Sequence, residues 1–274
     1  MVRGALVGLC AVLVAAGAAG CGGTGSAAPP TTTIRQLRQF RVVFPEGFTR
    51  AQMVARVGAV AKIAEHESRR KVKLSGDAYE AATATPRTFP GFGAKKLPLE
   101  GFLFPDTYNF DRKSTSPQLM QQQLSEFDSE WMRLNLSYAR SKNLTPYDVL
   151  TIASMVEGEA QVPSERPLVA AVIYNRLHQQ MPLGIDATLR FGLHVPPTQS
   201  LTQSELQDPT PYNTRLHDGL PPTPINNPGM ASLEAAAHPA HVDYLYFVRK
   251  PDHRHHYFTA NYQDFLQHEA QYGY

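Results

Sequence analysis

The sequence predicts an α+β fold, with a small βα module at about residues 34–97 followed by a larger mixed α/β domain at 98–274. Three observations support this prediction. Apolar residues recur at helical spacing through most of the chain, whereas strand-like runs are few and short. Two strand-like runs near the C-terminus are separated by a turn and can pair as a hairpin. A proline- and glycine-rich segment ends at Pro98, where the composition changes, and this marks the boundary between the two parts.

The first module begins with a strand at 41–47 that runs into a turn. Thr49 is a good N-cap for a helix at about 50–65, in which apolar residues are spaced for burial. A basic cluster at 69–73, which we interpret as a solvated face, precedes a second helix at 75–84. The pattern therefore predicts a strand followed by helices.

The larger domain opens with an aromatic segment and is then mainly helical. The elements expected, in chain order, are a strand and turn at 99–108, helices at 116–141, 145–157 and 167–178, a proline- and glycine-rich loop region at 182–229, a helix at 230–237, strands at 244–248 and 255–259, and a helix at 261–271. Thr145 and Pro146 suit the start of the helix that ends at Glu157. The region 182–229 is long for a weakly structured segment inside a compact domain, and such segments are often functional.

Residues 1–20 are expected to be a lipoprotein-type signal peptide. Their apolar run at 5–19 follows a positive charge and is short for a membrane-spanning helix. Small residues immediately before Cys21 resemble a bacterial lipobox, in which the cysteine is lipidated, although leucine is commoner than Ala18 at that position. Residues 21–33 are expected to form a flexible tether. We therefore expect an extracytoplasmic chain anchored by lipid to the outer face of the cytoplasmic membrane, with simple secretion as the alternative.

Charge and cysteine content exclude several kinds of protein. The chain has 26 Lys and Arg residues against 24 Asp and Glu residues, for a formal net charge of +2. This balance, without a basic stripe interleaved with aromatic residues, argues against a nucleic-acid surface. Cys10 would leave with the signal and Cys21 would carry lipid, so neither a disulfide nor a cysteine nucleophile is expected.

The motifs of several enzyme classes are absent. The sequence contains no G-x-S-x-G elbow, no Walker loop, no H-E-x-x-H pair and no G-x-G-x-x-G. His253, His255 and His256 lie close in sequence, but their spacing suits no common zinc motif, and a hairpin places the last two on opposite faces. No metal and no cofactor is therefore expected, which leaves carboxylate chemistry.

Glu157 is the best candidate for that chemistry. It ends an apolar helix whose buried face includes Ile152 and Val156, so its carboxylate lies along or beside that face. Partial desolvation raises the pKa of a carboxyl group and makes it a plausible proton donor near neutral pH. The alternative is a glutamate at the helix edge with its carboxylate in water. Asp186, expected in a loop, is either a second carboxylate for an ordinary glycosidase or the residue that forms an Asx-turn.

Motifs that run from about residue 99 to the C-terminus resemble those of the YceG-like endolytic murein transglycosylases. In chain order they are LEGFLFPDTY at 99–108, ASMVEGE at 153–159, VIYNRL at 172–177, MPL at 181–183, DAT at 186–188, PYNT at 211–214, GLPP at 219–222, PINNPG at 224–229, AAHPA at 236–240 and YLYFV at 244–248. The first module resembles the LysM-like subdomain of the family through Val43–Gly47 and the helix that follows. The chain departs from the family pattern at Gly158, Arg190 and Thr223, and in its expected lipid anchor, because family members usually span the membrane with a helix.

The resemblance implies a catalytic role for Glu157. In lytic transglycosylases a carboxylic acid protonates the glycosidic oxygen after N-acetylmuramic acid. The resulting carboxylate then accepts the proton of the muramoyl C6 hydroxyl as this attacks C1, which gives a 1,6-anhydro ring. A single glutamate can perform both steps. Candidate substrate-binding residues are Glu100, Asn175, Arg176, Asp186, Thr188, Tyr212, Asn213 and Thr214. Turn formation or hydrogen bonding in the core is the alternative role for the polar loop residues among them.

The expected function is therefore endolytic cleavage of the MurNAc-β-1,4-GlcNAc bond of nascent glycan strands. The expected partners are the peptidoglycan glycan strand, the membrane through the N-terminal lipid and, as the family implies, cell-wall synthases. Two alternatives stay open: a hydrolytic muramidase on the same scaffold, and a peptidoglycan-binding lipoprotein without catalytic activity.

The signal segment yields a direct prediction about Cys21. Cells that express the chain with a labelled fatty acid should incorporate label into it, and Cys21→Ala should abolish the incorporation because the thiol is the expected attachment point. Cys10→Ala is the matched control and should leave the label in place. Equal labelling of the parent and the Cys21→Ala variant would exclude the lipobox interpretation.

Overall fold

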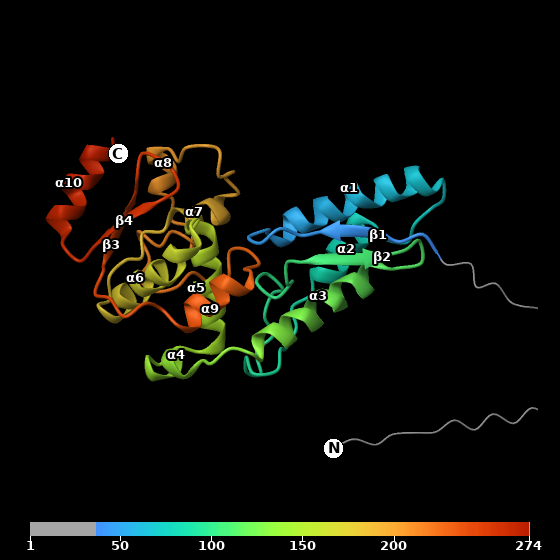
Figure 1. Ribbon diagram of the computed structural model, residues 1–274, viewed down its shortest axis with the longest axis horizontal. Coiled ribbons are helices and arrows are strands. Elements are labelled where there is room, and N and C mark those ends of the chain that lie inside the picture. Colours follow the sequence, from blue (N-terminus) through green and yellow to red (C-terminus); the bar gives the residue numbers. More distant parts are fainter. Residues whose placement is uncertain (1–36, 274) are drawn as a thin grey trace, which may run out of the picture. The chain divides into compact units, whose positions relative to one another are not determined.

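The computed structural model describes residues 37–273, which belong to one compact unit at Leu37–Tyr274. It combines many helices with a few short strands (Figure 1), and the predicted α+β class is confirmed. The expected signal peptide at 1–20, the tether at 21–33 and Cys21 lie outside the described residues. The LysM-like character of the first module stays a prediction.

The first part of the structure has the element order β-α-α-β. Its elements are β1 at Phe40–Val43, α1 at Arg50–Ser68, α2 at Gly76–Thr83 and β2 at Thr107–Phe110. Strand β1 pairs antiparallel with β2, with Phe40 opposite Phe110. The helix starts agree with the sequence, because Thr49 forms a capping box on α1 and Ser75 caps α2. Strand β2, which pairs with β1, lies beyond residue 97, so this small sheet extends across the boundary that the composition suggested.

The single helix predicted at 116–141 is wrong. The structure has two helices there, α3 at Ser116–Trp131 and α4 at Ser137–Ser141. Between them the Asn135 side chain accepts a hydrogen bond from the Ser137 N–H at 3.0 Å. Such a local bond offers the backbone an alternative to the helical pattern, and it explains the break.

Helix α5, at Pro146–Glu159, lies at the centre of the larger domain. Residues 149–156 of this helix are all buried, and Thr145 caps it as predicted. It packs against α6 at Arg166–His178 and α9 at Met230–Ala237. A short 3-10 helix, η1 at Pro163–Glu165, connects α5 to α6. A helix covered in this way holds its last turn, and therefore Glu157, in a fixed place.

The region at 182–229 is more ordered than its composition predicted. It contains α7 at Asp186–Leu193 and α8 at Gln203–Leu206. Asp186 and Thr188 therefore lie in a helix and not in a loop, as the sequence had suggested. The eight residues of α7 are amphipathic, as expected for a helix. The helix was not predicted because the prolines and glycines on either side of it are typical of a loop.

The C-terminal segment has the predicted arrangement of a hairpin followed by a helix. Strands β3 at Tyr246–Arg249 and β4 at His256–Thr259 pair antiparallel, and Asn261 caps α10 at Tyr262–Tyr272. Figure 1 shows α10 beside the hairpin, and the two are in contact. Within residues 37–273, none of the helices has the length and apolar character needed to cross a membrane.

Asn227 links three separate segments of the chain. Its side-chain oxygen accepts hydrogen bonds from the N–H groups of Gly101 and Leu103, each at 2.9 Å. Its side-chain nitrogen donates to the Phe48 carbonyl at 2.9 Å and to the Glu100 carboxylate at 2.8 Å. The side chain is fully buried, so these groups have no water to replace a lost partner.

Asn227→Ala should therefore destabilise the fold by about 2–4 kcal/mol, because it leaves buried N–H groups and a buried carboxylate without their partner. Urea denaturation followed by circular dichroism measures the change. Asn109→Ala removes an exposed asparagine of β2 and is the matched control, with an expected change within about 0.5 kcal/mol. A loss no larger than that of the control would show that the Asn227 bonds contribute little to stability.

Candidate functional site

A cleft of about 1410 Å³ contains most of the acidic residues singled out by the sequence. Its wall is built from the segment at 46–52, the C-terminal turn of α5, the start of α7, strand β3 and helix α10. The acidic residues that line it are Glu46, Glu100, Glu157, Glu159, Asp186 and Glu269. A polar cleft of this size is large enough for an extended ligand.

Glu157 is held in this wall by the start of α9. The side chain of Glu157 is only 8% exposed. Its Oε2 atom accepts a hydrogen bond from the Ser232 hydroxyl at 2.7 Å and another from the Gly229 N–H at 3.1 Å. Gly229 is the N-cap residue of α9, so the donor is one of the N–H groups at the start of this helix that have no partner within the helix. The last turn of α5 and the first turn of α9 together fix the carboxylate.

Arg166 determines the direction of the Ser232 hydrogen bond. The Arg166 Nε donates to the Ser232 oxygen at 3.1 Å, and a guanidinium group cannot accept. The single hydroxyl proton of Ser232 is therefore free to point at Glu157 Oε2. The other oxygen, Oε1, faces the Arg166 Nη2 at 3.7 Å and accepts no hydrogen bond from the described residues. One oxygen of Glu157 is thus fixed, and the other is available for chemistry.

Glu46 lies beside Glu157, in the turn after β1. Partial burial and the negative charge of Glu157 raise the pKa of Glu46, whereas the positive charge of Arg166 opposes the shift. Glu46, Arg166, Ser232 and the N–H of Gly229 were not among the predicted site residues. Glu46 and Gly229 do belong to quoted motifs, VFPEG and PINNPG, and those motifs were the signal available for them.

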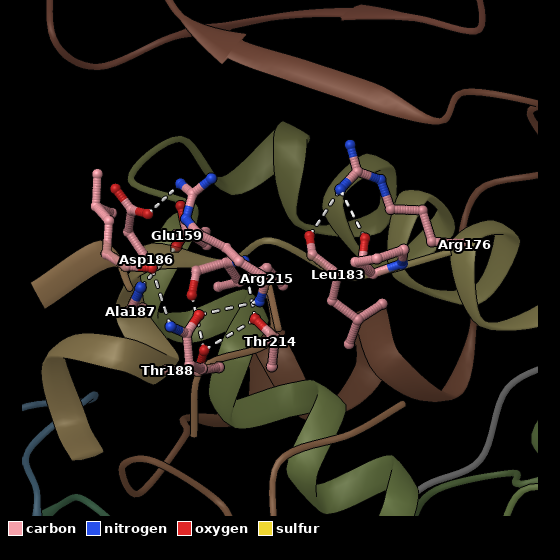
Figure 2. Close-up of polar contacts among 12 residues, drawn as sticks. Glu159, Arg176, Leu183, Asp186, Ala187, Thr188, Thr214 and Arg215 are labelled. Atoms are coloured by element: carbon pink, nitrogen blue, oxygen red, sulfur yellow. Dashed lines mark hydrogen bonds and ion pairs between the residues drawn. The ribbon is translucent and has the colours of Figure 1, made fainter. Parts of the chain in front are cut away.

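Glu159 and Asp186 form a second acidic group further along the cleft, shown in Figure 2. Glu159 accepts a hydrogen bond from the Ala187 N–H at 3.3 Å. Burial and the nearby charge of Asp186 raise the pKa of Glu159. Asp186 itself pairs with Arg215 at 2.5 Å, so its charge is compensated by a protein partner. Asp186 is therefore an ion-paired residue of the cleft wall in this structure.

Glu100 lines the cleft and is buried at the same time. It accepts hydrogen bonds from the Arg50 N–H at 3.0 Å and from the Asn227 amide at 2.8 Å. Burial raises the pKa of Glu100 to about 7, although the N–H and charge of Arg50 and the Asn227 amide act in the opposite direction. Glu100 therefore lines the cleft and also holds together parts of the chain distant in sequence through its bonds to Arg50 and Asn227.

Arg176 and Tyr212 are the remaining predicted site residues that reach the cleft. The Arg176 guanidinium donates to the carbonyls of Leu245, at 2.6 Å, and of Leu183, at 2.7 Å, and it lies over the Tyr246 ring. Figure 2 shows the bond to Leu183. The Tyr212 hydroxyl shares a hydrogen bond with the Thr223 hydroxyl at 2.9 Å. Both side chains thus contribute a surface to the cleft while bonded within the protein.

The other predicted polar residues do not line the cleft. The Asn175 amide donates to the carbonyls of Val242 and Tyr244, and the Asn213 amide donates to those of Leu206 and Asp208. The hydroxyls of Thr188 and Thr214 lie 3.0 Å apart in a buried pair that is visible in Figure 2. Hydrogen bonding in the core, the alternative left open by the sequence, is the geometry that the structure shows for these residues.

The histidines near the hairpin have individual acidic partners. His256 Nδ1 lies 2.8 Å from the Glu165 carboxylate in a buried pair, and His255 Nδ1 lies 2.8 Å from Asp252 at the surface. In the part of the chain that the structure describes, no group of three or more histidine, cysteine or acidic residues is placed to hold a metal ion.

The chain is similar to known proteins. The model of the YceG-like family matches residues 25–271. An endolytic murein transglycosylase of Bacillus subtilis is 38% identical over 157 residues, which are 57% of this chain and 43% of that protein. One from Streptococcus pneumoniae is 30% identical over 244 residues, which are 81% of this chain and 43% of that protein. The chain thus spans less than half the length of these curated relatives.

A solved structure gives the same result at the level of the fold. The crystal structure of a YceG-like protein from Listeria monocytogenes matches with a TM-score of 0.66 and 28% identity, over 83% of this chain and 75% of that one. Because the family model covers most of the sequence and the fold agrees with it, this chain belongs to the YceG-like family.

Proposed function

We propose that the chain is an endolytic lytic transglycosylase, which cleaves the MurNAc-β-1,4-GlcNAc bond within peptidoglycan glycan strands and leaves 1,6-anhydroMurNAc ends. The observation that carries the proposal is the geometry of Glu157. Its Oε2 is fixed by Ser232 and Gly229, whereas Oε1 accepts no hydrogen bond from the described residues. A carboxyl group with one fixed and one free oxygen can give up a proton and take one back without turning.

The reaction follows from this arrangement. Glu157 gives the proton on Oε1 to the glycosidic oxygen as the bond between that oxygen and C1 of the muramoyl residue breaks. The C6 hydroxyl of the same residue then attacks C1, and its proton passes to Glu157. The new bond closes the anhydro ring, no water is consumed, and Glu157 returns to its protonated form. One carboxyl group therefore serves as acid and then as base.

The proposal also includes a substrate, a location and protein partners. The substrate is a glycan strand lying in the cleft, whose volume and polar wall suit an extended sugar polymer. The lipid at Cys21 would keep the enzyme at the outer face of the cytoplasmic membrane, where new strands are made. Cell-wall synthases are the proposed protein partners there. The names of the curated relatives support the general activity.

Digestion of purified glycan by the protein and by Glu157→Gln tests the proposal. The parent should release anhydro ends, and Glu157→Gln should lower the rate by about 10²–10⁴-fold, because an amide cannot act as the acid. Mass spectrometry of the products separates anhydro ends from reducing ends, which contain one more water. Glu234→Gln, which changes an exposed carboxylate of α9 outside the cleft, is the matched control and should cut at the parental rate.

Three results of this digest would count against the proposal. Reducing ends alone would identify a hydrolytic muramidase. Full activity of Glu157→Gln would remove Glu157 from the role of acid. Binding of glycan without cleavage, by the parent as well as by the variant, would identify a binding lipoprotein.

Ser232→Ala tests how Glu157 is positioned. The variant removes the hydroxyl that donates to Oε2 and leaves the Arg166 Nε without its acceptor. The kcat should fall about 10–100-fold with little change in KM, because a hydrogen bond to a charged or reacting group is worth about 1.5–3 kcal/mol. Ser137→Ala, at an exposed serine of α4, controls for the substitution itself. An unchanged kcat in Ser232→Ala would show that the Gly229 N–H alone is sufficient.

A further inference from the structure

The proposed reaction places positive charge on the muramoyl C1 and ring oxygen, and most of the polar residues predicted to bind substrate do not offer a free group to stabilise it. Asn175, Thr188, Asn213 and Thr214 lie outside the cleft wall, and Asp186 is paired with Arg215. We propose that the Glu46 carboxylate is the anion that stabilises this oxocarbenium-like charge. The inference rests on the proposed function and supplies a second catalytic residue for it.

A shared contact with Gly229 places Glu46 next to Glu157. The Gly229 N–H donates to Glu157 Oε2 at 3.1 Å. Glu46 Oε1 lies so close to the same residue that a methyl group added to Gly229 would come within 1.8 Å of it. Both carboxylates therefore touch one glycine. The next residue in the turn, Gly47, continues the contact, since a methyl group there would lie 3.4 Å from Glu157 Cγ.

Glu46 differs from Glu100, Glu157 and Glu159 in the same cleft, because its carboxylate accepts no hydrogen bond from the described residues. Its side chain is exposed to the cleft and accepts no hydrogen bond from residues 37–273. Glu157 and Glu159, in contrast, accept bonds from N–H or hydroxyl donors of the protein. An anion that accepts no hydrogen bond from the protein can direct its charge at a substrate carbon.

The charges that face Glu46 give the pH dependence of this role. Partial burial raises the pKa of Glu46, Glu157 from α5 raises it further when Glu157 is ionised, and Arg166 from α6 lowers it. The stabilising form is the anion. The rate should therefore rise with pH as Glu46 loses its proton, and it should fall on the acid side, starting at a higher pH than for an ordinary glutamate.

The bonds and protons balance with Glu46 acting through its charge alone. Glu157 gives its proton to the leaving oxygen, the bond from that oxygen to C1 breaks, and positive charge develops beside Glu46. The O6–C1 bond then forms, and the O6 proton passes to Glu157. Glu46 starts and ends the cycle as a carboxylate.

Glu46→Gln tests the charge directly, with the same glycan digest and a pH profile. The kcat should fall about 10²–10³-fold, the loss typical when a charge-stabilising group is removed. The fall in rate at low pH that arises from protonation of Glu46 should disappear from the pH profile, because an amide does not titrate in this range. Glu234→Gln should keep both the parental rate and the parental pH profile.

Gly229→Ala tests the position of Glu46 while its charge is kept. Gly229 has φ −80° and ψ 172°, which alanine adopts without strain, and the N–H to Glu157 is retained. The new methyl group must displace the flexible Glu46 carboxylate. We expect the rate to fall about 10–100-fold in the parent. In a Glu46→Ala background the same change should cost nothing further.

The results separate failure of this inference from failure of the proposed function. Anhydro ends from the parent together with an unchanged rate and pH profile in Glu46→Gln would overturn the role of Glu46 and leave the proposed function intact. Equal losses from Gly229→Ala in both backgrounds would also overturn it, since the methyl group would then act through Glu157. A parent that releases no anhydro ends would overturn the proposed function and this inference with it.

Discussion

The site depends on the way the buried Asn227 amide ties three loops together. The Asn227 side chain binds the N–H groups of Gly101 and Leu103 and the carbonyl of Phe48. The backbone carbonyl of Asn227 accepts a hydrogen bond from the Gly47 N–H at 2.9 Å. Gly229 follows two residues later and supplies the N–H that fixes Glu157. The side chain and the backbone of Asn227 together therefore set the distance between the turn that carries Glu46 and the helix start that holds Glu157.

This constraint explains how loops with little regular structure can carry a defined site. Loops are free to vary unless their backbone groups find fixed partners, and buried N–H and carbonyl groups must be paired. At Asn227 both requirements are met together, because each donor and acceptor of the side chain has a partner in the protein. The rigid elements on either side, α5 and α9, pack against each other, so the positions set by the amide are retained.

The sequence predicted the parts of this arrangement that depend on local rules. The caps at Thr49 and Thr145, the hairpin and the place of Glu157 beside the apolar face of its helix follow from residue types within a few positions of each other. The sequence did not predict helix α7, because the prolines and glycines around it resemble those of a loop. It also did not predict the contacts of Ser232 with Glu157 and Arg166, because these residues are 75 and 66 positions away in the chain.

The same distinction decides what can be inferred about the acids of the cleft. Their residue type is visible in the sequence, whereas the donors that bind them are mostly backbone N–H groups and amides of distant segments. Glu100 is bound by an amide 127 positions away, and Glu157 by an N–H 72 positions away. The role of a carboxylate follows from the partners that it has and those that it lacks. Glu46 lies in a quoted motif, yet only the fold shows that it faces the cleft without a hydrogen-bond donor among the described residues, and this is the property that fits it to stabilise charge on a substrate.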